Sequence, residues 1–148
     1  MTRTISLSID SRPECIELLS CALYGLCQLT GLPATEVARI DLAMVEAANN
    51  AVEHAYGGES GHPVVVEFHL TPERFCLVVL DRGAAMDSRQ LDLAGTFGDP
   101  DFSDPDTWSI RGRGLAIIKS CMDVVEYHTR DGLNALSMSR ALGSAHPA

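Results

Sequence analysis

Residues 64–81, VVVEFHLTPERFCLVVLD, decide the fold, because two apolar segments are separated there by a short polar connection. The segments 64–70 and 75–81 have the length and β-branched content of strands, and the connection TPER is short enough for an antiparallel pair. The second segment is apolar at both alternating sets of positions. It is therefore expected in the middle of a sheet that helices cover on at least one side.

Further strands are predicted near both ends of the chain. Residues 4–9 alternate with period two and direct their three apolar side chains to one face. Residues 123–129 and 135–141 flank Asp131-Gly132, a dipeptide that favours a tight hairpin turn. The sheet is thus expected to be mostly antiparallel.

Helices are predicted between these strands. One begins at Ser11, whose hydroxyl is expected to cap the helix while Glu14 closes a capping box, and it runs to about Thr30. A second spans residues 35–56, and a short third helix follows the glycines of residues 111–114. The predicted fold class is an α/β two-layer sandwich, a mostly antiparallel mixed sheet with helices on one face.

The composition limits the classes of function. With 148 residues, 46% of them apolar, the chain is expected to form one domain over residues 1–148. Its formal net charge of −9 disfavours nucleic acid and anionic membranes as partners. No apolar run is long enough to span a membrane and the N-terminus lacks a signal-peptide core, so a cytoplasmic location is expected. Five cysteines without a CxxC pair predict buried thiols rather than disulfides or a zinc site.

Residues 84–110 contain six aspartates, two prolines and little periodicity, which predicts a long loop. Loops of this length in compact domains are usually functional or mobile. A flexible lid over a ligand is therefore favoured over a disordered insertion.

The first candidate motif lies on the second helix, where Glu46, Asn50 and His54 recur every four residues and share one stripe. The side-chain oxygen of an asparagine suits Mg²⁺, and Asn49 is a rival for that role because it lies near the same face. Glu46 could accept the proton of an incoming hydroxyl, and His54 is expected to position a ligand. A solvated polar helix face would produce the same pattern, so the motif by itself is not specific.

The second motif, Asp81-Arg82-Gly83, ends the central strand. A buried carboxylate needs a partner, and Asp81 could accept a hydrogen bond from the exocyclic amine of a ligand base. The same sequence also forms an ordinary turn in many proteins.

The third motif is RGRGL, residues 111–115, which leads into a short helix. Glycine lets the backbone approach an anion, and the start of a helix offers free N–H groups. The guanidinium groups of Arg111 and Arg113 suit phosphate oxygens. A plain helix-initiating turn is the alternative, but the order of the three motifs and the lid could supply one nucleotide site.

The three motifs together resemble those of a known protein family. The segments EAANNAVEH (46–54), VLDRG (79–83) and RGRGLAII (111–118) resemble the N, G1 and G2 boxes of the GHKL ATPases, the group of histidine kinases, gyrase and MutL. The chain length and the ending HAYGG (54–58) are most similar to the anti-sigma-factor serine kinases typified by RsbW and SpoIIAB. The resemblance covers nearly the whole chain and implies a Bergerat-type ATP-binding fold.

The resemblance also implies roles for single residues. Asn50 would be the Mg²⁺ ligand, Glu46 the general base, Asp81 the acceptor of the adenine amino group and Gly83 the turn that admits the base. The remaining residues implied at the nucleotide are His54, Arg111, Gly112, Arg113, Gly114 and Leu115, with Gly112 and Gly114 against the phosphates. Many relatives have a second glycine where this chain has Ala85, which narrows the expected entrance for adenine.

By this resemblance the protein is expected to be a serine/threonine-protein kinase that uses ATP and Mg²⁺. Its substrate would be a serine or threonine of a STAS-domain anti-anti-sigma antagonist, and it would be a homodimer that also binds a sigma factor or another regulator. The alternative is a non-catalytic, nucleotide-gated module that sequesters such a regulator. A third interpretation is that the motifs coincide by chance and the domain binds another ligand.

Overall fold

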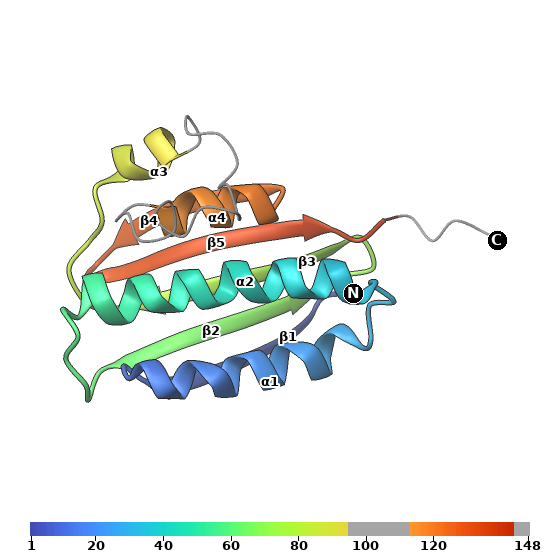
Figure 1. Cartoon of the computed structure of the whole chain (residues 1–148), viewed down its shortest axis with the longest axis horizontal. Helices are drawn as coiled ribbons and strands as arrows, with labels where there is room; N and C mark the ends of the chain where they lie inside the picture. The colour runs from blue at the N-terminus through green and yellow to red at the C-terminus, as the bar shows by residue number, and fades with distance from the viewer. Residues whose placement is uncertain (95–112, 144–148) are drawn as a thin grey trace, which may run out of the picture.

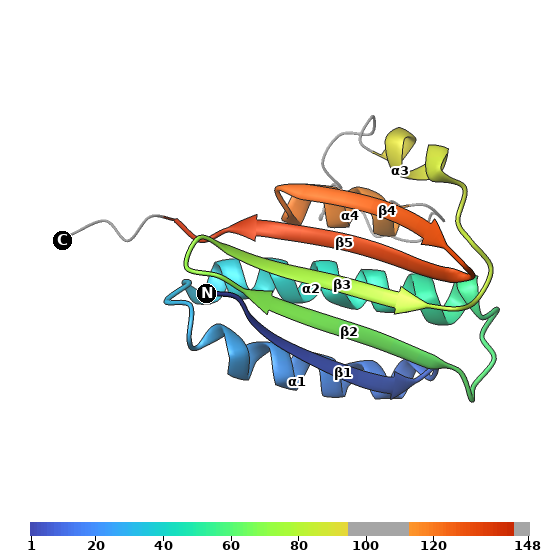
Figure 2. The same cartoon turned by 180° about the vertical axis from the view of Figure 1, so that it is seen from behind.

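The computed structural model describes residues 1–94 and 113–143 of the chain. They form two layers, a sheet and a set of helices that covers one of its faces (Figures 1 and 2). The other face of the sheet carries no helix in this part of the chain (Figure 2). The predicted two-layer α/β sandwich is therefore confirmed.

The sheet has five strands in the order β1-β2-β3-β5-β4. The strands are β1 (Arg3–Asp10), β2 (Pro63–Leu70), β3 (Arg74–Asp81), β4 (Val124–Arg130) and β5 (Leu133–Ala141). All four neighbouring pairs among these strands are antiparallel, and β3 occupies the predicted central place. The turn between β4 and β5 has positive φ at Asp131 (53°) and Gly132 (78°), as a tight hairpin of this kind requires.

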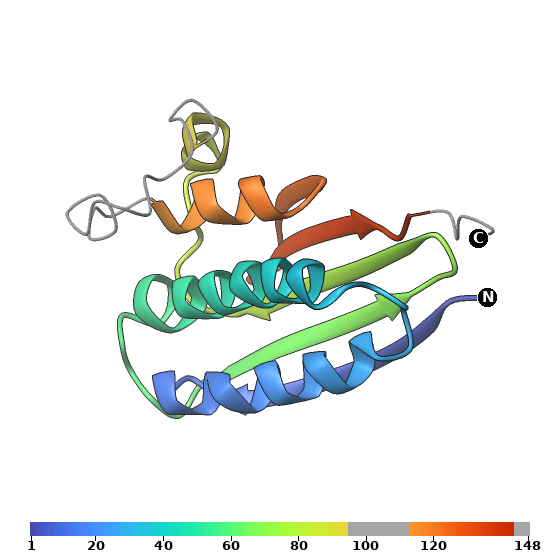
Figure 3. The ribbon, with the colours of Figure 1, turned by 45° about the vertical axis from the view of Figure 1, so that its right-hand side comes forward.

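Three helices pack side by side on the sheet (Figure 3). They are α1 (Ile16–Cys27), which follows one 3₁₀ turn η1 (Pro13–Cys15); α2 (Ala34–Asn50), which continues as the π-helical turn η2 (Ala51–Ala55); and α4 (Arg113–Cys121). Leu19, Ile40 and Met44 are completely buried between these helices and the sheet. No helix of the described ranges has both the length and the apolar content needed to cross a membrane.

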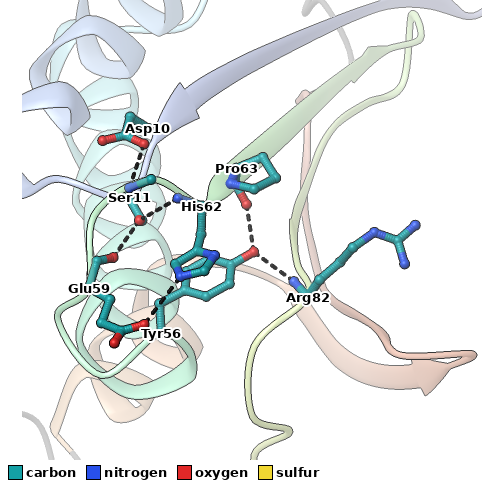
Figure 4. Close-up of polar contacts among 8 residues, drawn as sticks. Asp10, Ser11, Tyr56, Glu59, His62, Pro63 and Arg82 are labelled. Carbon is teal, nitrogen blue, oxygen red and sulfur yellow. Dashed lines mark hydrogen bonds and ion pairs between the residues drawn. The ribbon is translucent and has the colours of Figure 1, made fainter.

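The predicted capping box at Ser11 is wrong. The helical segment begins with Pro13, and its N-cap, Arg12, makes no side-chain cap bond. The Ser11 hydroxyl instead donates to the Glu59 carbonyl at 2.6 Å and accepts from the His62 N–H at 3.1 Å (Figure 4). A tertiary contact between the end of β1 and the segment before β2 thus replaces the local cap.

The predicted lid, residues 84–110, is not a loop throughout. Residues Ser88–Ala94 form a short helix, α3, which packs on α4 and buries Leu91 and Ala94. The Lys119 ammonium on α4 donates to the Leu91 carbonyl at 3.0 Å. Two buried residues are too few for periodicity to reveal this helix, and the lid from residue 95 to 110 lies outside the described residues.

The prediction of buried thiols is wrong for one cysteine. Cys27 and Cys121 are buried and Cys15 and Cys76 are partly buried, but Cys21 is exposed on α1. All five are free thiols. Cys21 is exposed because it follows the buried Leu19 by two positions, about half a helical turn.

Candidate functional site

A cavity of about 950 Å³ opens between α2 with its extension η2, the end of β3 and the start of α4. This volume is typical of sites for small molecules and cofactors. The residues predicted from the sequence that line the cavity are Glu46, Asn50, His54, Asp81, Gly114 and Leu115. Asn49, the rival metal ligand, also lines it. The polar stripe of α2 is therefore the wall of a cavity and not simply a solvated face.

At one end of the cavity, α2 faces the start of α4. A Cβ atom on Gly114 would lie 2.9 Å from Glu46 Oε2 and 3.5 Å from Asn50 Oδ1. The helix start therefore lies in contact with the ends of both side chains, and a side chain at residue 114 would require the Glu46 carboxylate to shift. Within the described ranges, the Glu46 and Asn50 side chains have no hydrogen-bond partner of their own, so their oxygens are available to a ligand.

The electrostatics of Glu46 suit a proton acceptor. Partial burial raises the pKa of its carboxyl group above the ordinary value, and the negative charge of Glu53 raises it further. A raised pKa brings a carboxylate closer to the operating pH of an enzyme and so makes it a better general base.

This end of the cavity also fits a magnesium ion. Carboxylate and amide oxygens are the hard ligands that Mg²⁺ takes from proteins, and it takes its other ligands from water and phosphate. Asn50 Oδ1 and the Glu46 carboxylate both lie at the glycine gap in front of α4. The absence of a side chain at Gly114 lets the start of α4 lie close to these oxygens, and the free N–H groups of a helix start can bind a phosphate group.

At the other end of the cavity, Asp81 closes β3. Its Oδ1 atom accepts hydrogen bonds from the Gly83 N–H at 3.0 Å and from Asn134 Nδ2 at 2.7 Å. Within the described part of the chain both bonds end on Oδ1. The second oxygen, Oδ2, therefore remains as an acceptor for a donor group in the cavity.

Gly83 does not line the cavity. A Cβ atom at this position would lie 2.2 Å from the Ala55 carbonyl oxygen and 2.4 Å from its carbon, and the next residue, Ala84, donates its N–H to that oxygen at 2.8 Å. The glycine therefore lets the turn after β3 pack on the backbone of η2. It shapes the cavity by that close approach.

The end of η2 explains how this contact forms. The turn is π-helical, with a bond from Tyr56 N–H to the Ala51 carbonyl at 3.0 Å, and such turns are common at functional sites. Ala55 is its last residue, and the last carbonyl groups of a helix have no helical partner. The Ala55 carbonyl receives its partner from the turn after β3.

Sequence reasoning missed two tyrosines at the site. The Tyr56 hydroxyl donates to the Pro63 carbonyl at 2.7 Å and accepts from the Arg82 N–H at 2.8 Å (Figure 4). The Tyr127 hydroxyl, on the cavity wall, accepts from the Met86 N–H at 2.9 Å. The pattern around neither residue reveals these bonds, because each joins the hydroxyl to backbone outside its own helix or strand.

The buried Asn134 was missed as well, although the sequence contains a signal for it. Asn134 alternates with the buried Leu136 and Met138 and so points to the core side of β5. A polar residue at an inward position of a strand needs a specific partner. The predicted strand began at residue 135, which left Asn134 in the turn.

The predicted phosphate residues are only partly described. Gly114 and Leu115 lie on α4 and line the cavity. Arg111 and Gly112 lie outside the described residues, as does the side chain of Arg113.

Comparison with known proteins identifies the family to which this chain is similar. A family model described as "Histidine kinase-like ATPase domain" matches residues 9–140. The serine-protein kinase RsbW of Bacillus pumilus is 30% identical over 133 residues, which cover 87% of this chain and 80% of the relative. RsbW of Listeria innocua is 27% identical over 134 residues, 89% of this chain and 83% of the relative.

Solved structures share the fold. The RsbU and RsbW domains of Rv1364c from Mycobacterium tuberculosis match with a TM-score of 0.65 at 19% identity, over 94% of this chain and 32% of the mycobacterial chain. The SiaB-SiaC complex from Pseudomonas aeruginosa matches with a TM-score of 0.57 at 15% identity, over 91% of this chain and 89% of that chain.

Proposed function

Because the chain belongs to the histidine kinase-like ATPase domain family, we propose that its cavity binds Mg·ATP and that the protein is a serine/threonine-protein kinase. One observation carries the proposal. The cavity has hard oxygen ligands and a side-chain-free helix start at one end, and a fixed carboxylate acceptor at the other. A nucleoside triphosphate needs both kinds of surface within one cavity, the first for its metal-bound phosphates and the second for its base.

In this proposal each motif has one role. Asn50 Oδ1 would hold Mg²⁺, which would neutralise charge on the phosphates, and the start of α4 at Gly114 would lie beside them. Asp81 accepts the amino group of adenine. Glu46 takes the proton of the attacking serine or threonine hydroxyl, whose oxygen bonds to the γ-phosphorus as the bond to the bridging oxygen breaks and ADP leaves.

His54 and Leu115 complete the proposed nucleotide wall, with Arg111, Gly112 and Arg113 at the phosphates. The curated relatives named serine-protein kinase RsbW support protein phosphorylation as the reaction. The substrate we propose is a STAS-domain anti-anti-sigma protein, in a partner-switching pathway where the kinase also binds a sigma factor or another regulator. We further propose a cytoplasmic homodimer with no nucleic-acid partner.

Transfer of radiolabelled phosphate from ATP to a candidate STAS-domain protein tests the reaction. The wild-type chain should label a serine or threonine, Glu46→Ala should bind nucleotide but transfer no label, and Asn50→Ala should bind Mg·ATP more weakly. Glu17→Ala, a change at an exposed position of α1, is the matched control and should retain both properties.

Three results would count against the proposal. Equal labelling by wild type and Glu46→Ala would remove Glu46 as the base. Stable capture of the partner without any phosphorylated residue would favour the non-catalytic sequestering module. Absence of binding heat and of thermal stabilisation at millimolar Mg·ATP would contradict both the kinase and the nucleotide-gated module. The remaining interpretation would be that the domain binds another ligand.

A further inference from the structure

We propose that two residues outside the cavity wall, Asn134 and Tyr56, set the base selectivity of the site by fixing Asp81 and its turn. The inference rests on the proposed nucleotide binding. Neither residue lines the cavity, and both are buried, with 2% of Asn134 and 9% of Tyr56 exposed. They are therefore positioning residues that act through Asp81.

Asn134 holds the carboxylate itself. Its Nδ2 group donates to Asp81 Oδ1 at 2.7 Å and to the Gly83 carbonyl at 3.0 Å. Both partners are acceptors, so only the NH₂ end of the amide can face them. Thr129 fixes the opposite end, because its hydroxyl donates to Asn134 Oδ1 at 3.3 Å. The orientation of this amide is thus determined from both sides.

Tyr56 holds the backbone of the same turn. Its hydroxyl accepts from the Arg82 N–H and donates to the Pro63 carbonyl, so it joins the ends of β3 and β2 (Figure 4). The Tyr56 ring stacks on His62 with 4.8 Å between ring centroids and 12° between planes, which restrains the ring. Arg82 follows Asp81 directly, so a shift of its N–H would turn the Asp81 side chain.

The consequence for a ligand follows from hydrogen-bond complementarity. With Oδ1 occupied by two donors, Asp81 offers only an acceptor, Oδ2, to the cavity. A 6-amino group can donate to this oxygen, whereas a 6-keto group would place two acceptors against each other. Without its fixed partners the carboxylate could rotate, and the distinction between the two bases would weaken.

Binding of ATP and of inosine triphosphate, with Mg²⁺, to the full chain tests the inference by calorimetry. Asn134→Ala should weaken ATP binding about tenfold, the loss expected for one hydrogen bond to a carboxylate, and change inosine triphosphate binding much less. Tyr56→Phe, which keeps the ring, should act in the same direction by about threefold. In both variants the preference for ATP should fall.

Matched controls separate this effect on base preference from a general loss of stability. Ser139→Ala removes another buried polar group of β5, one that accepts from Arg74, and Tyr24→Phe removes an exposed hydroxyl from α1. Both should keep the wild-type preference. A urea titration of each variant shows whether it is folded. If Asn134→Ala is not folded, the nucleotide preference of Tyr56→Phe tests the inference.

The inference is overturned if folded Tyr56→Phe and Asn134→Ala keep the wild-type preference for ATP. A variant that loses the same factor of affinity for ATP and for inosine triphosphate also keeps that preference and overturns the inference. It is also overturned if the wild type binds ATP and inosine triphosphate equally. A wild type that binds neither nucleotide contradicts the proposed function instead, so the two failures are distinguishable.

Discussion

The two ends of the cavity are built differently. At the proposed base end, the turn after β3 is held by the Ala55 carbonyl, the Tyr56 hydroxyl and the Asn134 amide. At the proposed phosphate end, the Glu46 and Asn50 side chains have no hydrogen-bond partner of their own within the described ranges. The proposed base end is thus fixed by the protein and leaves one acceptor, Asp81 Oδ2, to a ligand, whereas the side chains of the proposed phosphate end are not fixed by hydrogen bonds among the described residues.

Each end contains one glycine, and the two differ in what surrounds them. Neither Gly83 nor Gly114 has a positive φ, so both owe their importance to space and not to backbone conformation. The space beside Gly83 is bounded by backbone of η2, which cannot move aside. The space beside Gly114 is bounded by the tip of the Glu46 side chain, which can. The following changes test this contrast, from the largest expected effect to the smallest.

Gly83→Ala should be the most damaging change. Its Cβ would stand 2.2 Å from the Ala55 carbonyl oxygen, so the turn must separate from η2 and lose the Ala84 bond. We expect a loss of about 2–4 kcal/mol in the free energy of unfolding, measured by urea titration. Gly25→Ala, in open space on α1, is the control and should be neutral or stabilising. Equal stability of Gly83→Ala and wild type would contradict the rigid base end.

Asp81→Asn should change what the base end recognises. The new side chain can still accept from Gly83 N–H and Asn134 through its oxygen, but it would present an NH₂ donor where Oδ2 was. ATP binding should fall about a hundredfold and the preference should shift toward inosine triphosphate. Calorimetry with the two nucleotides measures both effects. Unchanged ATP affinity would remove Asp81 from the site.

Gly114→Ala should separate stability from binding. The new methyl group meets only the movable end of Glu46, and alanine favours a helix, so stability should stay within about 1 kcal/mol of wild type. The methyl group would displace the Glu46 carboxylate beside the proposed phosphate site, and ATP affinity should fall about tenfold. Thermal unfolding with and without Mg·ATP measures both. If Gly114→Ala is stabilised by nucleotide as strongly as Gly25→Ala, the phosphates lie elsewhere.

Glu46→Gln should give the smallest effect, on stability and its dependence on pH. Burial raises the pKa of Glu46 above 4.5, so ionised Glu46 is less favourable in the folded chain than in the unfolded chain. The variant avoids this penalty and should melt about 2 °C higher at pH 7. The gain should shrink as the pH falls through the raised pKa of folded Glu46 and be absent below 4.5, where Glu46 is protonated in the folded and the unfolded chain alike. Glu17→Gln, a change at an exposed position, should show no such dependence on pH. The same dependence of melting temperature on pH in both variants would contradict an unfavourable ionisation of Glu46 in the folded chain.

Local sequence patterns were sufficient to predict most of the helices and strands. The two apolar segments 64–70 and 75–81 with their short connection predicted the central hairpin, and Asp131-Gly132 predicted the second one, because strand and turn preferences depend on neighbours in sequence. Patterns failed where a tertiary contact replaced a local one. Ser11 is the clear case: the sequence favours a helix cap, but its hydroxyl is committed to Glu59 and His62.

The candidate site shows the same division. The stripe of Glu46 and Asn50 was visible because helical periodicity is a local property. The bond from Asn134 to Asp81 was not visible, since it joins residues 53 positions apart and depends on the register of β3 with β5.

The sequence by itself determined which faces are apolar, where the chain turns and which polar side chains share a helix stripe. Only the tertiary structure decided that Gly114 stands against Glu46, that Gly83 packs on Ala55 and that Asn134 orients Asp81. The physical reason is the range of the interactions. Periodicity and turn preference act over a few residues, whereas space for a glycine or a partner for a buried amide exists only once distant strands and helices have packed together.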